Sequence, residues 1–168
     1  MDHLLQIKDL TVSYYTDLGR ARALNNIELK LNKGDKLGLV GESGSGKSTM
    51  GLAMMRMIKP PGRIESGAVV IGGIDLLSLR EKEMLKSRLS TISYIPQGAM
   101  NSLNPVLKIK RQIFDSYYAH RKKKGGDKVM DLAREAIDSV DLDEHVLEMY
   151  PHELSGGMKQ RVCIAIGI

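Results

Sequence analysis

The chain has 168 residues, a length that suits one domain better than two. Hydrophobic residues make up 42% of it and charged residues 27%, a composition that excludes an intrinsically disordered chain. One cysteine excludes a secreted disulfide scaffold, and no apolar stretch reaches the ~20 residues of a membrane span. The excess of basic residues, 25 against 20 acidic ones, admits polyanionic partners, and the N-terminus lacks signal-peptide features, so we expect a cytoplasmic protein.

Strand patterns dominate the first half of the chain. Alternating apolar residues predict strands over residues 4–15 and 24–31, and a short apolar run predicts a buried strand over residues 37–40. A helix is expected from about Lys47 until the helix-breaking residues 60–62, Pro-Pro-Gly. Shorter elements follow: strands over residues 69–71 and 91–95, and an amphipathic helix over residues 80–89.

The rest of the chain is predicted to be helical. A loop over residues 101–105 is followed by helices, of which the clearest covers residues 128–140 and places its apolar residues on one face. A short helix is expected over residues 141–149, and a last helix should begin near Ser155. The basic run at residues 121–124 is expected to be a solvated helix end and loop rather than a polyanion site.

A phosphate-binding loop is the strongest motif. Residues 41–48, Gly-Glu-Ser-Gly-Ser-Gly-Lys-Ser, match the P-loop pattern G-x-x-x-x-G-K-[ST]. The glycines allow a tight turn with inward N–H groups, and the following helix directs the positive end of its dipole at the same anion. Lys47 can reach the β- and γ-phosphates, and the Ser48 hydroxyl can ligate Mg²⁺. The loop predicts nucleotide binding but is shared by kinases, GTPases, helicases and transport ATPases.

A second unusual stretch covers residues 154–161, Leu-Ser-Gly-Gly-Met-Lys-Gln-Arg. Ser155 followed by two glycines and a helix-forming run is a helix N-terminus with few side chains, which can offer a hydroxyl and bare amides to an anion. Alone, an N-cap with flexible glycines would be the simpler interpretation. Because a P-loop lies upstream, the anion-binding interpretation is favoured.

With both motifs, the sequence resembles the nucleotide-binding subunit of an ABC transporter. Residues 154–158 resemble the LSGGQ signature with Met158 in place of glutamine, and residues 94–97, Tyr-Ile-Pro-Gln, resemble the Q-loop. Residues 98–105 and 150–157 resemble the oligopeptide, dipeptide and nickel importer subgroup. The resemblance implies an α/β P-loop NTPase fold of the ABC type, with an N-terminal antiparallel β-subdomain, an incomplete parallel core sheet and a helical subdomain.

The resemblance also implies site residues. Tyr14 lies where the family places the aromatic that stacks on adenine, and Tyr15 is the less favoured candidate. Gln97 would position Mg²⁺ and the attacking water, and Lys47 is the other expected catalytic residue. The residues expected to bind ATP are Tyr14, Gly41, Ser43, Gly44, Ser45, Gly46, Lys47, Ser48 and Thr49, with Ser155, Gly156 and Gly157 acting in trans, and the expected Mg²⁺ ligands are Ser48 and Gln97.

The implied function is that of an ATP-binding subunit of an ABC importer, which couples ATP binding and hydrolysis to transport at the cytoplasmic face of the membrane. The subgroup resemblance implies that the transported substrate is a peptide. Its expected partners are a second ATP-binding subunit (a copy or a paralogue), transmembrane permease subunits and, indirectly, a substrate-binding protein, with no nucleic acid. The chain would form the N-terminal part of one ATP-binding domain, with the β-subdomain and P-loop core in residues 1–97 and the Q-loop and helical subdomain in residues 98–168.

Some residues of the family pattern find no match in this sequence. The family places the Walker B aspartate, a catalytic glutamate and a switch histidine after the signature helix, and none of the 168 residues can take these roles. His152, beside the signature, is expected to be structural. We therefore expect the chain alone to hydrolyse ATP poorly, and its unpaired sheet edge to favour self-association.

Three alternatives remain open at this point. The chain could be a non-catalytic fragment that only binds nucleotide. It could be a soluble P-loop phosphotransferase, which would leave residues 154–160 unexplained. It could be an ABC-type ATPase of nucleic acid, but such proteins carry a long coiled coil between the P-loop and the signature, and the separation here is too short for one.

Overall fold

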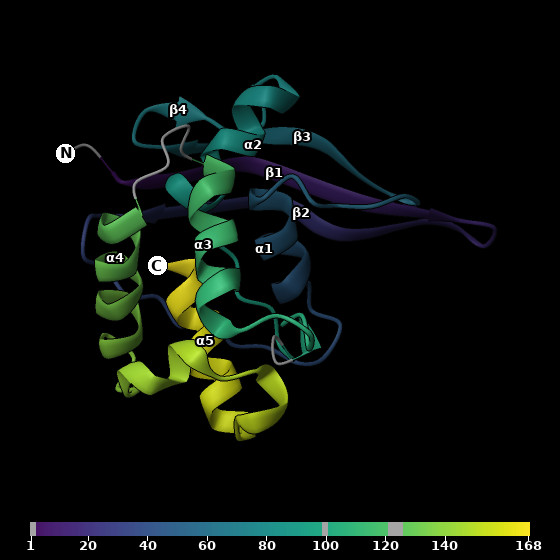
Figure 1. Ribbon diagram of the computed structural model, residues 1–168. Helices are drawn as coiled ribbons and strands as arrows, with labels where there is room; N and C mark the ends of the chain where they lie inside the picture. Colours follow the sequence, from purple (N-terminus) through teal and green to yellow (C-terminus); the bar gives the residue numbers. More distant parts are fainter. Residues whose placement is uncertain (1–2, 99–100, 121–125) are drawn as a thin grey trace. The chain divides into compact units, whose positions relative to one another are not determined.

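The computed structural model describes residues 3–98, 101–120 and 126–168, and it divides into two compact units, Met1–Ile92 and Ser93–Ile168 (Figure 1). Each unit has its own hydrophobic core. The domain division predicted from sequence, after Gln97, stays a prediction. None of the helices in the described ranges has the length and apolar character needed to cross a membrane. The basic run at residues 121–124 lies outside the described residues.

The first unit is built on a four-stranded antiparallel sheet in the order β2-β1-β3-β4 (Figure 1). Its strands are β1 (Leu5–Thr16), β2 (Gly19–Leu31), β3 (Gly62–Ile71) and β4 (Ile74–Asp75). The predicted strands over residues 4–15, 24–31 and 69–71 are confirmed. Two of them are longer than expected, because β1 and β2 pair as a hairpin up to Thr16 and Gly19, and because β3 pairs with β1 as far as Gly62.

Two helices cover the core of the first unit. The predicted helix starts are confirmed by α1 (Lys47–Met54) and α2 (Glu81–Ser90). Helix α1 ends well before residues 60–62, because Arg56 takes a left-handed φ of 49°. The core combines buried apolar residues of the sheet, of both helices and of the loop after β4: Ile7, Leu10, Val12, Leu24, Met50, Ala53, Val69, Leu76 and Met84.

The second unit is helical, as predicted. Its elements are α3 (Ile109–His120), α4 (Gly126–Asp138), the 3₁₀ helices η2 (Glu144–Glu148) and η3 (Pro151–Glu153), and α5 (Gly156–Gly167). The predicted helices over residues 128–140 and from Ser155 are confirmed, and the short helix expected over residues 141–149 is η2.

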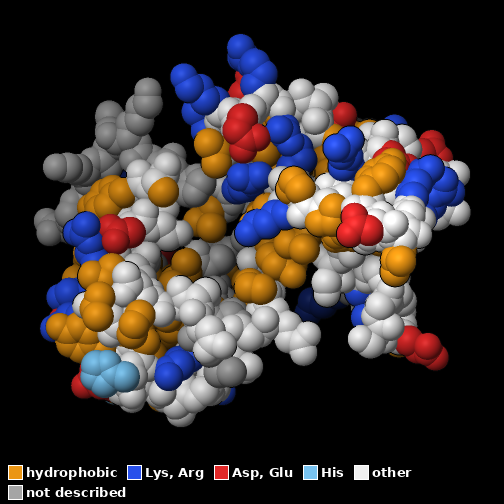
Figure 2. Space-filling view, turned by 90° about the vertical axis from the view of Figure 1, so that its right-hand side faces the viewer, with side chains coloured by type: hydrophobic (Ala, Val, Ile, Leu, Met, Phe, Trp, Pro, Cys, Tyr) orange, Lys and Arg blue, Asp and Glu red, His pale blue; other side chains and the backbone are white. Residues whose placement is uncertain are grey.

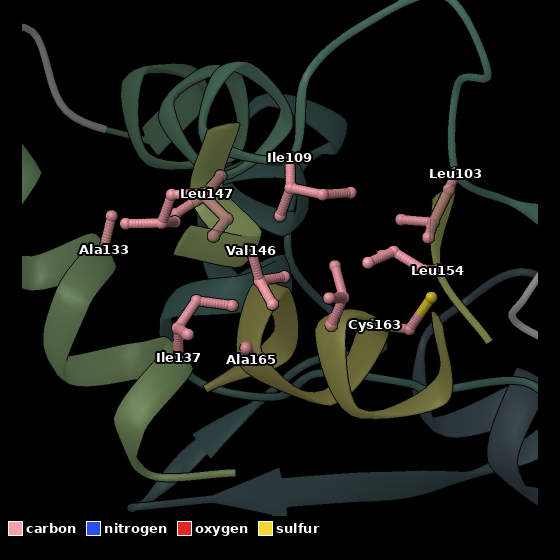
Figure 3. Packing of buried hydrophobic residues seen from close by; sticks show 11 residues of the cluster. Leu103, Ile109, Ala133, Ile137, Val146, Leu147, Leu154, Cys163 and Ala165 are labelled. Atoms are coloured by element: carbon pink, nitrogen blue, oxygen red, sulfur yellow. The ribbon is translucent and has the colours of Figure 1, made fainter. Parts of the chain in front are cut away.

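The core of the second unit draws on all three of its long helices. Figure 3 shows Ile109 of α3, Ala133 and Ile137 of α4 and Ala165 of α5 converging on Val146 of η2. On α4 the fully buried residues are four positions apart and lie on the apolar face that the sequence pattern indicated. This packing fixes the start of α5, because Leu154 and Cys163 flank the first turns of α5 and belong to the same core.

Two strand predictions were wrong. Residues 37–40 are irregular, with Leu39 49% and Val40 95% exposed, and Ile92 forms only an isolated parallel bridge with Arg88. A buried parallel strand needs hydrogen-bonded neighbours on both sides, and the described residues offer residues 37–40 none. Over the described part of the chain, the named strands therefore pair only in antiparallel fashion. Figure 2 shows hydrophobic side chains reaching the surface of one face.

Candidate functional site

The loop over residues 41–46 turns directly into α1. Gly44 and Gly46 have φ values of 85° and 93°, the left-handed conformation that favours glycine. Gly46 is the N-cap of α1, and its carbonyl accepts a hydrogen bond from Met50 N at 2.9 Å. The first turn of α1 carries no acidic side chain, so the amides of the helix N-terminus and the positive end of the dipole face the loop unopposed.

The packing of the loop is tight at two of its glycines, against backbone at Gly46 and against a side chain at Gly41. A Cβ at Gly46 would lie 2.7 Å from the carbonyl oxygen of Ala23 and 3.0 Å from Leu24 Cδ2, both on β2. A Cβ at Gly41 would lie 2.8 Å from Ser45 Oγ. The sheet therefore fixes the end of the loop, and Gly46 is required by space as well as by φ.

Lys47 folds back over the loop. Its Nζ donates hydrogen bonds to the carbonyl oxygens of Gly41 and Glu42, each at 2.6 Å, and to Ser45 Oγ at 3.0 Å. The ammonium group is thus held inside the curve of the loop. The Glu42 side chain is exposed, as expected from the sequence, and Ser48 at the start of α1 is also exposed. An anion entering the loop would meet the Lys47 charge and the α1 amides together.

Tyr14 lies near this loop within the first unit. On β1 it is opposite Ala21 of β2 and Gly62 of β3. Its ring is half-buried, and a Cβ at Gly62 would lie 2.7 Å from Tyr14 Cε1. Gly46 lies against Ala23, two residues along β2 from Ala21, so the same stretch of β2 brings Tyr14 and the loop together.

Tyr15 is engaged elsewhere. Its hydroxyl donates a 2.6 Å hydrogen bond to Glu65 Oε1, and the Arg63 guanidinium lies 5.6 Å from its ring centre. The hydrogen bond to Glu65 raises the pKa of Tyr15, and the same bond, with smaller contributions from Ser13 and Arg20, lowers the pKa of Glu65. Because its hydroxyl and one ring face already have partners, the geometry favours Tyr14 as the ring available to a nucleotide base.

The start of α5 matches the anion-binding interpretation of the second motif. Ser155 is the N-cap, and its Oγ accepts a hydrogen bond from Met158 N at 3.3 Å. Gly156 and Gly157 are exposed, and a Cβ at Gly157 would meet nothing within 4 Å. Met158, which stands where the family has glutamine, packs against the second core. The first turn therefore presents two residues without side chains to solvent while its third residue anchors it.

Gln97 is exposed in the second unit. Further along the chain, Gln112 of α3 anchors the loop that precedes this helix. Its Oε1 accepts from Asn104 N at 2.8 Å, and its Nε2 donates to the carbonyls of Asn104 and Leu107, each at 3.0 Å. A polar residue on a helix carries no local pattern for such a role, so the sequence could not indicate it.

Two other candidate residues, His152 and Cys163, make contacts typical of structural residues. His152 is exposed and stacks on Tyr150, with ring centres 5.6 Å apart, which agrees with its expected structural role. Burial raises the pKa of the Cys163 thiol. In the described parts of the chain, no group of three or more His, Cys, Asp or Glu residues could hold a metal ion.

Comparison with known sequences agrees with these motifs. The profile of the ABC transporter family matches residues 24–168. The oligopeptide transport ATP-binding protein OppD of Bacillus subtilis is 39% identical over 98% of this chain and 47% of its own length. The dipeptide transport ATP-binding protein DppD of Caldanaerobacter subterraneus is 40% identical over 100% of this chain and 52% of its own length. The chain thus spans about half the length of the curated relatives that it matches.

Comparison with solved structures gives the same fold. The dimeric structure of a bacterial ABC transporter cassette superimposes with a TM-score of 0.83 at 28% identity, over 98% of this chain and 68% of the cassette. A post-hydrolysis state of the same cassette, bound to ADP and Pi, gives a TM-score of 0.82 at 29% identity, over 98% of this chain and 68% of that one. The resemblance and the ABC-type α/β fold predicted from the sequence are confirmed. With a family match over residues 24–168 and the loop and signature in place, the chain belongs to the ABC transporter family.

Proposed function

We propose that this chain forms the ATP-binding part of an ABC importer subunit, which couples ATP binding and hydrolysis to transport across the membrane. The observation that carries the proposal is the loop at residues 41–46, where left-handed glycines, the uncovered N-terminus of α1 and the Lys47 ammonium meet. This combination provides inward amides, a helix dipole and a cation for a triphosphate.

ATP and Mg²⁺ fit the residues present. Lys47 would exchange its hydrogen bonds to the loop carbonyls for phosphate oxygens, and Tyr14 would stack on the base. Mg²⁺ usually keeps several waters and takes one or two protein ligands beside substrate phosphates, so the exposed Ser48 hydroxyl suits it better than a protein cage would. Gln97 is proposed as a further Mg²⁺ ligand on the family resemblance alone. When bound, ATP supplies the γ-phosphoryl group that passes to water.

The signature helix is proposed to act on a second subunit. The amides of Gly156 and Gly157 and the Ser155 hydroxyl are exposed at the start of α5, which suits contact with a γ-phosphate held by another P-loop. The dimeric state of the related cassette supports this arrangement. The second subunit is proposed to be a copy or a paralogue of the whole protein.

The transported substrate is proposed to be a peptide. The relatives are named oligopeptide and dipeptide transport ATP-binding proteins, and they align with almost the whole of this chain. The whole subunit would lie at the cytoplasmic face of the membrane, bound to permease subunits and served indirectly by a substrate-binding protein. Binding and release of nucleotide would drive the permease through alternating conformations.

Calorimetric titration of Mg-ATP into the chain tests the proposal. The parent chain should bind, and Lys47→Ala should lose binding because it removes the cation of the loop. Lys36→Ala, which removes an exposed lysine shortly before the loop, is the matched control and should bind like the parent. Equal binding by Lys47→Ala, or a folded parent chain that shows no binding, would contradict the proposal.

A further inference from the structure

We infer that Arg88 is a positioning residue for the phosphate-binding loop, because it holds the C-terminal end of the helix whose N-terminal end forms the anion site. The inference rests on the proposed function in so far as ATP is the ligand of that loop. Arg88 lies near the end of α2, and its side chain is only 23% exposed.

The contacts of Arg88 are those of a helix cap. Its Nε donates to the carbonyl oxygen of Met55 at 3.1 Å, and its Nη2 donates to that of Arg56 at 3.2 Å. Met55 is the C-cap of α1, and the last carbonyls of a helix have no partner within the helix. The last turn of α1 carries no basic residue, so Arg88 also brings a positive charge to the negative end of the α1 dipole.

A second arginine ties the same helix end to the start of α2. Arg56 has a left-handed φ of 49°, a position at which glycine is usual. Its Nη1 donates to the Leu79 carbonyl, and its Nη2 lies 2.9 Å from Glu81 Oε2. The other carboxylate oxygen of Glu81 is 3.7 Å from Arg88 Nη1. The Arg56 side chain therefore joins the end of α1 to the start of α2, and these contacts offset the cost of its left-handed backbone.

The backbone leaves the helical conformation at Arg88, the residue whose side chain reaches the end of α1. Arg88 (ψ 136°) and Leu89 (φ 68°) leave the helical conformation, and Leu89 N donates to the Ile92 carbonyl at 2.8 Å. Arg88 thus holds α1, and the hydrogen bond from Leu89 N to Ile92 closes the turn that follows it. Helix α1 has eight residues, about 12 Å, and its other end is fixed where Gly46 contacts β2. A short helix held at both ends keeps the loop amides in one orientation.

Two measurements on Arg88→Gln test this inference, with Lys86→Gln as a control that removes a positive charge from an exposed position of the same helix. The first is amide hydrogen exchange of α1 in the ligand-free chain. Arg88→Gln should exchange the α1 amides about tenfold faster, the effect of roughly one lost charge-assisted hydrogen bond, and Lys86→Gln should not. The second is the Kd for Mg-ATP, measured below the melting range where circular dichroism shows each variant to be folded.

In folded molecules, Arg88→Gln should raise the Kd for Mg-ATP about tenfold, and Arg88→Lys should fall between parent and Arg88→Gln, because one ammonium nitrogen replaces a fork of two donors. A residue that only stabilises the fold would lower the melting temperature and leave this Kd unchanged. Unchanged exchange of α1, or an unchanged Kd, would overturn the inference. If the folded parent binds no ATP, the proposed function fails, and the exchange measurement still decides whether Arg88 holds α1.

Discussion

Replacing Gly46 by alanine should destabilise the chain far more than replacing Gly44, although the two glycines share one loop and one conformation. Their φ values are 93° and 85°. A Cβ at Gly44 would meet nothing within 4 Å, whereas a Cβ at Gly46 would lie 2.7 Å from the Ala23 carbonyl oxygen. Comparing Gly44→Ala with Gly46→Ala therefore separates the free-energy cost of the left-handed backbone from the cost of steric overlap with β2.

The magnitudes follow from those two terms. A left-handed conformation costs a residue with a Cβ roughly 1–2 kcal/mol, and Gly44→Ala should lose about that much free energy of unfolding. Gly46→Ala adds overpacking, typically about 1–3 kcal/mol, because the obstructing atom belongs to the backbone of β2 and cannot rotate away. We expect a total loss of about 2–5 kcal/mol for Gly46→Ala.

Urea denaturation followed by far-ultraviolet circular dichroism measures both losses. Gly34→Ala is a control outside the loop, since Gly34 also has a left-handed φ of 86° and open space around its Cβ position. It should behave like Gly44→Ala. Equal losses for Gly44→Ala and Gly46→Ala would refute the argument that β2 fixes the end of the loop.

Three further predictions concern the second core, the signature helix and acid stability. Because Ile137 is fully buried, Ile137→Val should lower the free energy of unfolding, measured by urea denaturation, by about 0.5–1.5 kcal/mol, and Ile137→Ala by about 2–5 kcal/mol. Equal losses would mean that the core collapses around the site. Ser155→Ala should lose about 1 kcal/mol and Ser155→Asp much less, since aspartate also caps Met158 N; a neutral Ser155→Ala would contradict the cap. The pKa of Glu65 lies below its ordinary value of 4.5, so its contribution to stability is present above pH 4.5 and is lost as the pH falls through the lowered pKa. Glu65→Gln should therefore destabilise the chain at neutral pH and make little difference in strong acid, and a constant effect across a pH series of melting temperatures would exclude this pairing.

The two motifs were predictable because their physics is local. In residues 41–48 the glycines, the lysine and the helix that follows act through neighbouring backbone, so the sequence alone indicated the loop and the start of α1. The same holds for Ser155 and α5, where the cap and the residue that it caps are three positions apart. The apolar face of α4 repeats every three or four residues and was equally visible.

Contacts between distant residues were decided by the tertiary structure. Residues 37–40 have the apolar run of a buried strand, but a strand exists only with hydrogen-bonded neighbours, and no pattern within the run can supply them. Tyr14 and Tyr15 are adjacent in sequence, and their different surroundings follow from the positions of Gly62 and Glu65 on β3.

The hydrogen bonds of Arg88 to the end of α1 show the same difference between local and long-range contacts. Arg88 is one of many arginines in the sequence, and its hydrogen bonds to Met55 and Arg56 span more than thirty residues. The sequence by itself determined the phosphate-binding loop, the signature helix and the family, because each depends on residues next to one another. The tertiary structure alone decided what holds the loop in place, because long side chains reach carbonyls whose positions follow from the packing of α1 against α2.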